Sequence, residues 1–254
     1  MRLERSHERP GIPDGVVVGK AFETRHAVGT PLPSHRHHLP YVALVLDGAY
    51  YEGSADGRWW CEPGTLIVHP PLHAHANWFP ERAVRVLNAS VERLPPDGIW
   101  SRYGVWKTGS ALTAAVLRDP DPSRLLDALA NSEPITPASA AGSAEGAALV
   151  LRRRPSISIG AAARMSGVSR EYIARAFRRH FGIPPRAFRA EHRLRMVLRL
   201  LADNTIPLTL VALDAGFADQ AHLTRTVRGA TGMSPARLRR WLGSITEGHI
   251  RSSK

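Results

Sequence analysis

The sequence predicts an α+β protein of two domains, in which a small antiparallel β-barrel with following helices precedes an all-α domain. Three observations carry this prediction. Short apolar segments separated by turn dipeptides run from Val16 to Val91, which is typical of antiparallel strands. One helical unit then occurs twice between Ile157 and Arg240, at an offset of 49 or 50 residues. The excess of basic residues is confined to the part of the chain that contains this repeat.

The expected strands are short and closely spaced. Tight turns are expected at the dipeptides Asp47-Gly48, Asp56-Gly57 and Pro63-Gly64. The segments expected to be strands are Val16–Val18, Tyr41–Leu46, Ala49–Glu52, Arg58–Cys61, Thr65–Val68 and Ala83–Val91. Such a series argues for a small antiparallel barrel or sandwich. The residues before it, 1–13, are expected to form a loose polar arm.

Helical patterns replace the strand pattern after the last of these segments. Residues 110–118 and 122–131 carry Leu and Ala at helical spacing. Residues 132–146 are rich in Pro, Ala, Ser and Gly, which is typical of a linker. The predicted division is therefore a first domain over 1–131, a linker over 132–146 and a second domain over 147–254.

Each copy of the repeat has the pattern of a helix-turn-helix, over about 157–182 and 206–232. A small residue, Ala163 or Ala212, lies four positions before a glycine, Gly167 or Gly216. The small side chain allows two helices to cross closely. The glycine can adopt the positive φ that ends the first helix and turns the chain. The second domain is therefore predicted to be a tandem helix-turn-helix domain.

The second helix of each unit should begin at a polar cap, Ser169 in the first copy and Asp219 in the second. In a helix-turn-helix this second helix enters the major groove of DNA. The residues expected to contact DNA are Ser169, Arg170, Glu171, Ala174, Arg175 and Arg178, with Gln220, Ala221, Thr224 and Arg225. Arg and Gln can read the edges of G and A bidentately, and Thr can bond a base or a phosphate. The simpler alternative is that these residues form the solvated faces of ordinary helices.

Residues 145–242 resemble the DNA-binding domain of AraC/XylS-family transcription regulators. The second copy carries the family's signature at Ile206, Val211-Ala212, Gly216-Phe217, Gln220, Leu223, Arg225 and Gly232-Met233-Ser234-Pro235. Two positions depart from it, since Val227 stands where the family often has Phe, and His222 where it often has an aromatic residue, Ser or Thr. The resemblance implies two recognition helices joined by a connecting helix, here Ala187–Ala202. It also implies base reading by Glu171, Ala174 and Arg175 in the first helix and by Gln220, Ala221 and Arg225 in the second.

Seven of the twelve histidines lie between His26 and His75, inside the expected barrel. His35 and His37 are separated by one residue, which places both imidazoles on one face of an extended chain. A third histidine from a neighbouring strand, such as His75, would complete a site for one divalent ion, zinc or a similar metal.

These segments resemble the cupin-like sensor domain of many AraC-type regulators, through His35-x-His37 and through Pro63-Gly64 followed by Pro70–His75. A metal-binding cupin usually has Glu four residues after its second histidine, and here that position is Tyr41. This difference argues against a catalytic iron site. Three interpretations stay open: a three-histidine metal site, a pocket for an organic ligand without metal, or neither.

The net charge of +12 is unevenly distributed. From Val150 onward there are 20 Lys and Arg against 6 Asp and Glu, whereas the preceding residues have 14 against 16. This asymmetry is expected of a phosphate-binding domain beside a nearly neutral one. The sequence has neither an apolar segment long enough for a membrane span nor a secretory leader, so no membrane association is expected. Cys61 is single, which excludes an internal disulfide and fits the cytoplasm.

These features favour a cytoplasmic transcription regulator, such as an activator, that binds double-stranded DNA and senses a small molecule or metal ion through its N-terminal domain. The main alternative is a cupin-type metal-dependent enzyme fused to a DNA-binding module, but no catalytic residues are identified. A purely architectural DNA-binding protein would not need so large an N-terminal domain. RNA polymerase and a second copy of the chain are candidate partners, the latter through the amphipathic segments Ala111–Leu117 and Leu125–Leu129.

Overall fold

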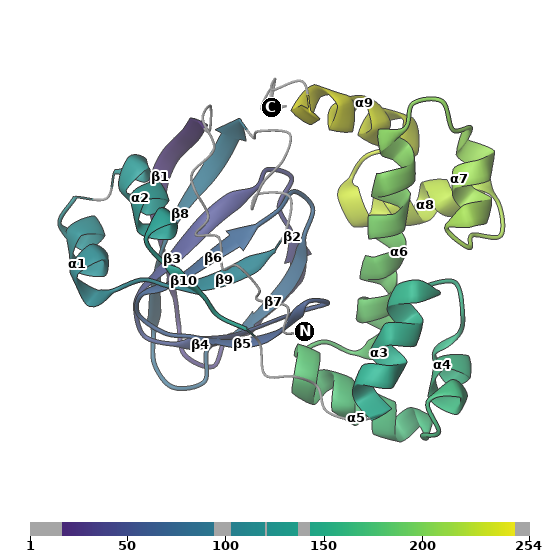
Figure 1. Cartoon of the computed structure of the whole chain (residues 1–254), viewed down its shortest axis with the longest axis horizontal. Coiled ribbons are helices and arrows are strands. Elements are labelled where there is room, and N and C mark those ends of the chain that lie inside the picture. The colour runs from purple at the N-terminus through teal and green to yellow at the C-terminus, as the bar shows by residue number, and fades with distance from the viewer. Residues whose placement is uncertain (1–16, 94–102, 120, 137–142, 247–254) are drawn as a thin grey trace, which may run out of the picture.

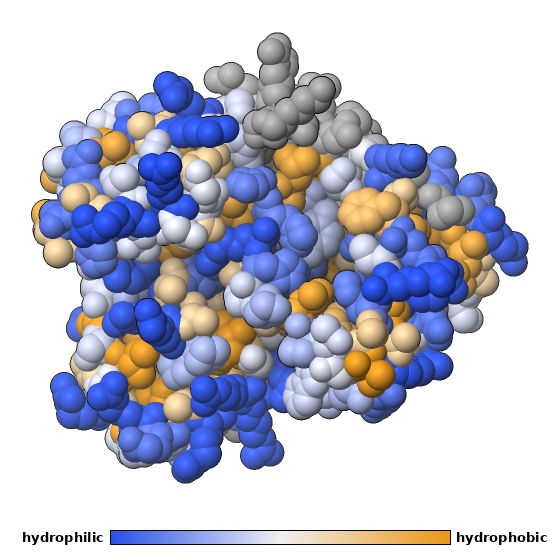
Figure 2. All heavy atoms as spheres, turned by 180° about the vertical axis from the view of Figure 1, so that it is seen from behind, coloured by the Kyte–Doolittle hydropathy of each residue, from blue (hydrophilic) through white to orange (hydrophobic). Residues whose placement is uncertain are grey.

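The computed structural model describes residues 17–93, 103–119, 121–136 and 143–246, which form a sheet-rich part and a helical part lying side by side (Figure 1). The predicted N-terminal arm, residues 1–13, lies outside the described residues. Within the described ranges, no helix is both long enough and apolar enough to cross a membrane. From behind, the surface is mainly hydrophilic with separate apolar patches (Figure 2).

The sheet-rich part consists of two antiparallel sheets, with strand orders β1-β8-β3-β6-β9-β10 and β2-β7-β4-β5. The strands of the larger sheet are Val17–His26 (β1), Tyr41–Asp47 (β3), Thr65–His69 (β6), Val84–Arg93 (β8), Gly104–Lys107 (β9) and Glu133–Pro134 (β10). Those of the smaller sheet are Leu32–Arg36 (β2), Tyr50–Ser54 (β4), Gly57–Cys61 (β5) and Ala74–Trp78 (β7). The predicted antiparallel class is confirmed.

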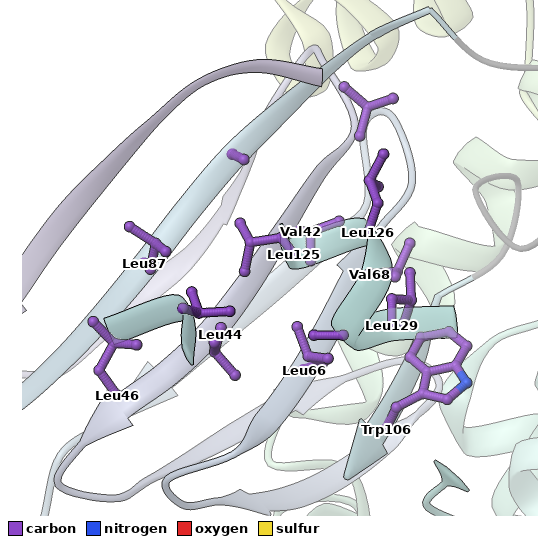
Figure 3. Close-up of a cluster of buried hydrophobic side chains, with 14 residues drawn as sticks. Val42, Leu44, Leu46, Leu66, Val68, Leu87, Trp106, Leu125, Leu126 and Leu129 are labelled. Atoms are coloured by element: carbon purple, nitrogen blue, oxygen red, sulfur yellow. The ribbon is translucent and has the colours of Figure 1, made fainter. Parts of the chain in front are cut away.

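The larger sheet is apolar on both faces, and alternate residues of β3 serve two different cores. Ala43 and Val45 belong to a cluster between the sheets, with Tyr50 and Trp59 of the smaller sheet. Leu44, which lies between them, and its neighbours Val42 and Leu46 belong to a second cluster with the helices α1 (Ser110–Arg118) and α2 (Pro122–Ala130). Figure 3 shows these side chains beside the leucines of α2. That second cluster contains Val42, Leu44, Leu46, Leu125, Leu126 and Leu129. The apolar side of α2 is thus covered inside the chain.

Some strands have no clear signal in the sequence. The pattern does not predict β2, β7, β9 or β10, and it predicts only the start of β1. β2 and β7 contain histidines and polar residues instead of an apolar alternation, and they are strands because they pair with each other. β10 has only two residues and exists through its pairing with β9.

The helical part has two similar halves built around one helix, α6 (Pro185–Ala202). The first half contains α3 (Ser143–Arg153), α4 (Ile159–Met165) and α5 (Arg170–Phe181). The second contains α7 (Leu208–Asp214), α8 (Gln220–Thr231) and α9 (Pro235–Thr246). α6 supplies Phe188 to the first core and Leu194, Val197 and Leu201 to the second. The tandem arrangement is as predicted, and α6 is the expected connecting helix with two further residues at its start.

The division between the two parts remains a prediction. The segment expected to be a linker, 132–146, contains β10 and the first residues of α3, while residues 137–142 lie outside the described ranges. A Pro- and Ala-rich composition did not reveal β10, because its pairing with β9 is set by distant residues.

Candidate functional site

The two helix-turn-helix units use the turn chemistry that the sequence predicts. Gly167 and Gly216 have φ values of 67° and 72°, a conformation that side chains rarely adopt. The next helices, α5 and α8, begin at Ser169 and Asp219, whose side chains accept hydrogen bonds from the backbone N–H of the third residue on. These caps fix where each candidate recognition helix starts.

The side chains of α5 and α8 divide into a buried and an exposed face as predicted. Ile173, Phe177, Leu223 and Val227 are fully buried in the two cores. The predicted DNA contacts lie on the other side: Ser169, Arg170, Glu171, Arg175, Arg178, Gln220, Ala221 and Arg225 are exposed, whereas Ala174 and Thr224 are half-buried. The Thr224 hydroxyl donates to the carbonyl of Gln220, so its hydrogen is already used within α8.

The four arginines of these faces form no ion pair with any described residue; they are Arg170, Arg175, Arg178 and Arg225. Other arginines of the helical part have structural partners. Arg189 donates to the carbonyl of Ile157, and Arg239 donates to that of Ile206, at distances of 2.8 and 2.6 Å. The two arginines, and likewise the two isoleucines, occupy matching positions in the two copies of the sequence repeat. Guanidinium groups without ion-pair partners therefore lie on both recognition faces, whereas those of Arg189 and Arg239 bind within the helical part.

A cavity of about 390 Å³ opens in the sheet-rich part. Its walls combine aliphatic and aromatic side chains with imidazoles, and they include Phe22, Leu32, Phe79, His26, His35, His37, His69 and His75. A site of this kind suits a small ligand with an apolar body and a few polar groups. The cavity contains the histidines that the sequence singled out.

The three predicted metal ligands come together at this cavity. His35, His37 and His75 each offer a nitrogen atom within 4.8 Å of the other two. His35 donates from Nδ1 to the carbonyl of Pro33 at 2.9 Å, which leaves Nε2 free. His37 is exposed, whereas His75 is buried. Tyr41, at the position where a cupin would have Glu, lies with its hydroxyl 3.0 Å from His75 Nε2.

A second set of imidazoles was not predicted from the sequence. His69, His73 and His75 also lie within 4.8 Å of one another, and all three are buried. Burial first, and then the neighbouring imidazoles, lower the pKa values of His69 and His75 well below the ordinary value, so these rings are neutral. The sequence shows that three histidines lie close together from His69 to His75, but it does not indicate which imidazole rings come into contact.

The carboxyl group of Glu52 lies beside His69 inside the sheet-rich part. Its Oε2 is 3.7 Å from His69 Nε2, and its Oε1 accepts a hydrogen bond of 2.6 Å from Tyr103. Burial raises the pKa of Glu52 to about 7, against the hydrogen bonds from Tyr103 and Tyr50 that favour the ionised form. Glu52 is thus a buried acid that can change its charge near neutral pH.

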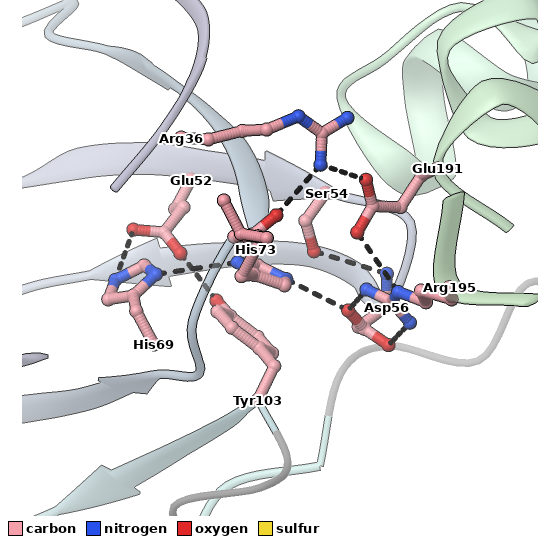
Figure 4. A network of polar contacts seen from close by, with 10 residues as sticks. Arg36, Glu52, Ser54, Asp56, His69, His73, Tyr103, Glu191 and Arg195 are labelled. Carbon is pink, nitrogen blue, oxygen red and sulfur yellow. Dashed lines mark hydrogen bonds and ion pairs between the residues drawn. The ribbon is translucent and has the colours of Figure 1, made fainter. Parts of the chain in front are cut away.

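A polar chain leads from His73 to the connecting helix, as Figure 4 shows. His73 Nε2 is 3.0 Å from Asp56 Oδ2, and Asp56 accepts two hydrogen bonds from Arg195 of α6. Arg195 also donates to Glu191, which accepts from Arg36 of β2. Burial alone would raise the pKa of Asp56, but the hydrogen bonds from Arg195 and His73 outweigh it and hold this pKa well below the usual range.

Apolar contacts accompany this polar chain at both helix-turn-helix units. Ala55, in the β4–β5 turn, belongs to the core around α5, and Leu72, between β6 and β7, belongs to the core around α8. Gly53 lies so close to the end of α5 that an added Cβ would be 2.7 Å from the carbonyl oxygen of Phe181. The sheet-rich part is therefore in direct contact with both halves of the helical part.

One family model and several solved structures resemble this chain over its helical part or over most of its length. A family model described as a helix-turn-helix domain matches residues 162–240. No curated protein matches the sequence. Among solved structures, ToxT from Vibrio cholerae is 8% identical with a TM-score of 0.41, over 89% of this chain and 98% of that chain. The C-terminal domain of AraT, a response regulator from Geobacillus stearothermophilus, is 21% identical with a TM-score of 0.39, over 41% and 88%. A transcriptional regulator with an AraC-type DNA-binding domain from Chromobacterium violaceum is 24% identical with a TM-score of 0.36, over 39% and 91%.

Proposed function

We propose that this chain, whose residues 162–240 match a helix-turn-helix family model, is a sequence-specific DNA-binding transcription regulator of the AraC type, controlled by an effector in its N-terminal domain. The observation that supports this most is the pair of exposed, arginine-bearing faces on α5 and α8. Their unpaired guanidinium groups are suited to phosphates and to the edges of guanine. A solvated helix face would not need the same arrangement twice.

The length of α6 fits this role. Its 18 residues span about 27 Å at 1.5 Å per residue. Recognition helices near its two ends can therefore approach the spacing of successive major-groove segments on one face of DNA, about 34 Å. One chain would then read two segments whose centres are about 10 base pairs apart.

The test is selection of bound sequences from random duplex DNA with the full-length protein. We expect enrichment of a two-part site and an affinity that falls steeply as salt increases, because arginines that neutralise phosphates release counterions. A selection that enriches no sequence, or binding that salt does not weaken, would contradict the proposal.

The effector site that we propose is the cavity of the sheet-rich part. An organic ligand would use its apolar walls and hydrogen-bond to the imidazoles, whereas a zinc-like ion would be held by His35, His37 and His75. Chelation separates these cases, since only the second effector is removed by a chelator. Contact of this part with both helix-turn-helix units gives an effector a direct route to DNA affinity.

Other roles and partners have less support. No observation favours a metal-dependent enzyme, and Tyr41 stands where the carboxylate ligand of such a site is expected. Contact with RNA polymerase and a homodimer remain proposals. Of the two segments expected to support a dimer, Leu125–Leu129 packs against the larger sheet, which leaves it no free apolar face. Sedimentation of the free and DNA-bound protein would measure the oligomeric state.

A further inference from the structure

The buried set of His69, His73 and His75 has the features of a metal site in its own right. Each of these residues is at most 3% exposed, and their nitrogen atoms lie within 4.8 Å of one another. They come from the end of β6, the following turn and β7, which hold them from both sheets. Of their ring nitrogens, His75 Nδ1 is buried without a hydrogen-bond partner among the described residues, and such an atom needs an explanation.

The hydrogen bonds of His73 determine which of its nitrogens is free. The Asp56 carboxyl group accepts two hydrogen bonds from the Arg195 guanidinium and acts as an acceptor toward His73 Nε2 as well, so this nitrogen carries the hydrogen. The lone pair is therefore on Nδ1, and Nδ1 faces His69 Nδ1 at 3.5 Å. On the far side of His69, the Glu52 carboxyl group lies 3.7 Å from Nε2. Each of these two rings thus has a carboxyl group near its Nε2 atom, and the two Nδ1 atoms face each other.

This geometry matches two ligands of one tetrahedral ion. Zinc–nitrogen bonds of 2.0–2.1 Å at the tetrahedral angle put two ligand nitrogens about 3.3 Å apart, close to the 3.5 Å between the two Nδ1 atoms. Metal-bound histidines commonly donate their other N–H to a carboxylate, which orients the ring and fixes its tautomer. His75 adds a third nitrogen, and its buried Nδ1 has no hydrogen-bond partner among the described residues.

We propose that His69, His73 and His75 bind a divalent cation of the zinc class, with Asp56 orienting the His73 ring and the Glu52 carboxyl group lying near the His69 ring. This set of His69, His73 and His75, the inner site, shares His75 with the outer triad of His35, His37 and His75. An ion can therefore occupy only one of the two at a time. The inner site is enclosed and its rings are held in place, whereas His37 is exposed. The inner site is therefore the tighter of the two.

The inner site has a direct link to the helix that joins the two DNA-binding units. Asp56 contacts His73 on one side and Arg195 of α6 on the other. An ion bound to His73 would alter the hydrogen bond between this ring and Asp56, and with it the contact of Asp56 with Arg195. An effect of the ion on DNA affinity rests on the proposed function, whereas binding of the ion does not.

Cobalt(II) and zinc(II) binding to the full-length, chelator-treated protein tests the site. We expect one ion per chain, with the visible absorption of tetrahedral cobalt(II). His69→Gln should weaken binding at least 100-fold, and Asp56→Asn should weaken it 10–100-fold, as loss of an orienting carboxylate does. His37→Gln removes a ligand of the outer triad alone and should keep the ion, and His180→Gln, at the end of α5, is the matched control. Thermal unfolding without metal shows whether each variant is folded.

The outcomes distinguish the two triads and the two proposals. Failure of the unchanged protein to take up cobalt(II) or zinc(II) overturns the inner site without reference to any variant. Loss of the ion in His37→Gln together with its retention in His69→Gln assigns it to the outer triad and also overturns the proposal. If the ion binds as expected but no DNA sequence is selected, the inner site stands and the regulator proposal fails.

Discussion

Arg175 and Arg225 occupy the same position in α5 and α8, six residues after the caps Ser169 and Asp219. Both are exposed and neither has an ion-pair partner among the described residues. Ala174 and Ala221, two other positions expected to contact bases, are too short to hydrogen-bond a base and offer only apolar contact. Readout by hydrogen bonds therefore falls mainly on these two arginines.

Replacing either arginine by Ala should weaken binding to the selected site by roughly 1–3 kcal/mol and relax base preference in one half of that site only. Binding of each variant to a panel of single-base operator variants measures this. Arg118→Ala, an exposed arginine at the end of α1, is the matched control and should change nothing. A uniform loss of affinity with unchanged base preferences would show that the arginines hold phosphates instead.

His192 is a second residue whose surroundings have a measurable consequence. Burial first, and then the charge of Arg195, lower its pKa to about 4, and its Nε2 is buried without a hydrogen-bond partner among the described residues. The folded state therefore resists protonation of this ring more than the unfolded state does.

This difference makes His192 a source of acid sensitivity. Stability is unaffected above pH 6.5, where the ring is neutral in both states, and decreases as pH falls from about 6.5 to about 4. The loss is on the order of 3 kcal/mol, from about 1.4 kcal/mol for each pH unit. Urea unfolding at several pH values should show a weaker pH dependence for His192→Gln. An identical slope in the variant would contradict the assignment.

At the scale of elements, the two turns of the helix-turn-helix units differ in their surroundings. Gly167 and Gly216 have nearly the same positive φ. A Cβ at Gly167 would meet nothing within 4 Å, whereas a Cβ at Gly216 would lie 2.3 Å from Ser156 Cβ. The second turn therefore needs glycine for two reasons, its conformation and the close approach of the segment before α4.

Substitution by Ala should reveal this difference. Gly167→Ala should destabilise the protein by about 1–2 kcal/mol, the strain of a left-handed residue. Gly216→Ala adds a steric conflict and should be worse by a further 1–3 kcal/mol or so. Urea unfolding of both variants measures the two effects. Equal losses would mean that Ser156 moves aside freely.

At the scale of the whole molecule, charged groups from distant parts of the chain hold the two parts together. Asp56 and Arg195 are 139 residues apart, and Arg36 and Glu191 are 155 apart. Glu191 is buried, and although burial raises its pKa, Arg36 and Arg195 outweigh this and lower the pKa overall. The other part of the molecule supplies a guanidinium group to each of these carboxylates, Arg195 to Asp56 and Arg36 to Glu191, and Arg195 of the same helix also pairs with Glu191.

A double-mutant cycle tests whether this contact couples the two parts. Asp56→Asn and Arg195→Met should each destabilise the protein, and the double variant should be more stable than the sum of losses implies. A coupling energy of about 1–3 kcal/mol is expected for two groups in one network. Chemical unfolding of the four proteins gives this value. Additive losses would mean that the pair does not join the parts energetically.

The same cycle, measured as affinity for the selected DNA site, shows whether the contact also controls the recognition helices. Arg195 lies on α6, which packs against both helix-turn-helix cores. We expect Asp56→Asn and Arg195→Met to change DNA affinity in the same direction. Arg240→Met is a control in the same part of the chain.

The sequence by itself determined the features that depend on neighbours along the chain. The faces of α5 and α8 follow from the helical period, and their starts follow from Ser169 and Asp219. The strands beside Asp47-Gly48 and Pro63-Gly64 follow from turn chemistry. His35 of β2 and His37 just after it both line the cavity, as the alternation of side chains along an extended chain predicts.

Tertiary structure alone decided which distant groups meet. Nothing near His73 in the sequence indicates that Asp56 orients its ring or that Arg195 holds Asp56. Nothing near Glu133 predicts a strand, since β10 exists by pairing with β9. Such contacts depend on how two sheets and α6 pack, and packing is a property of surfaces assembled from the whole chain. The inner histidine set could therefore be found only in the folded protein, because local periodicity carries no information about which surfaces come into contact.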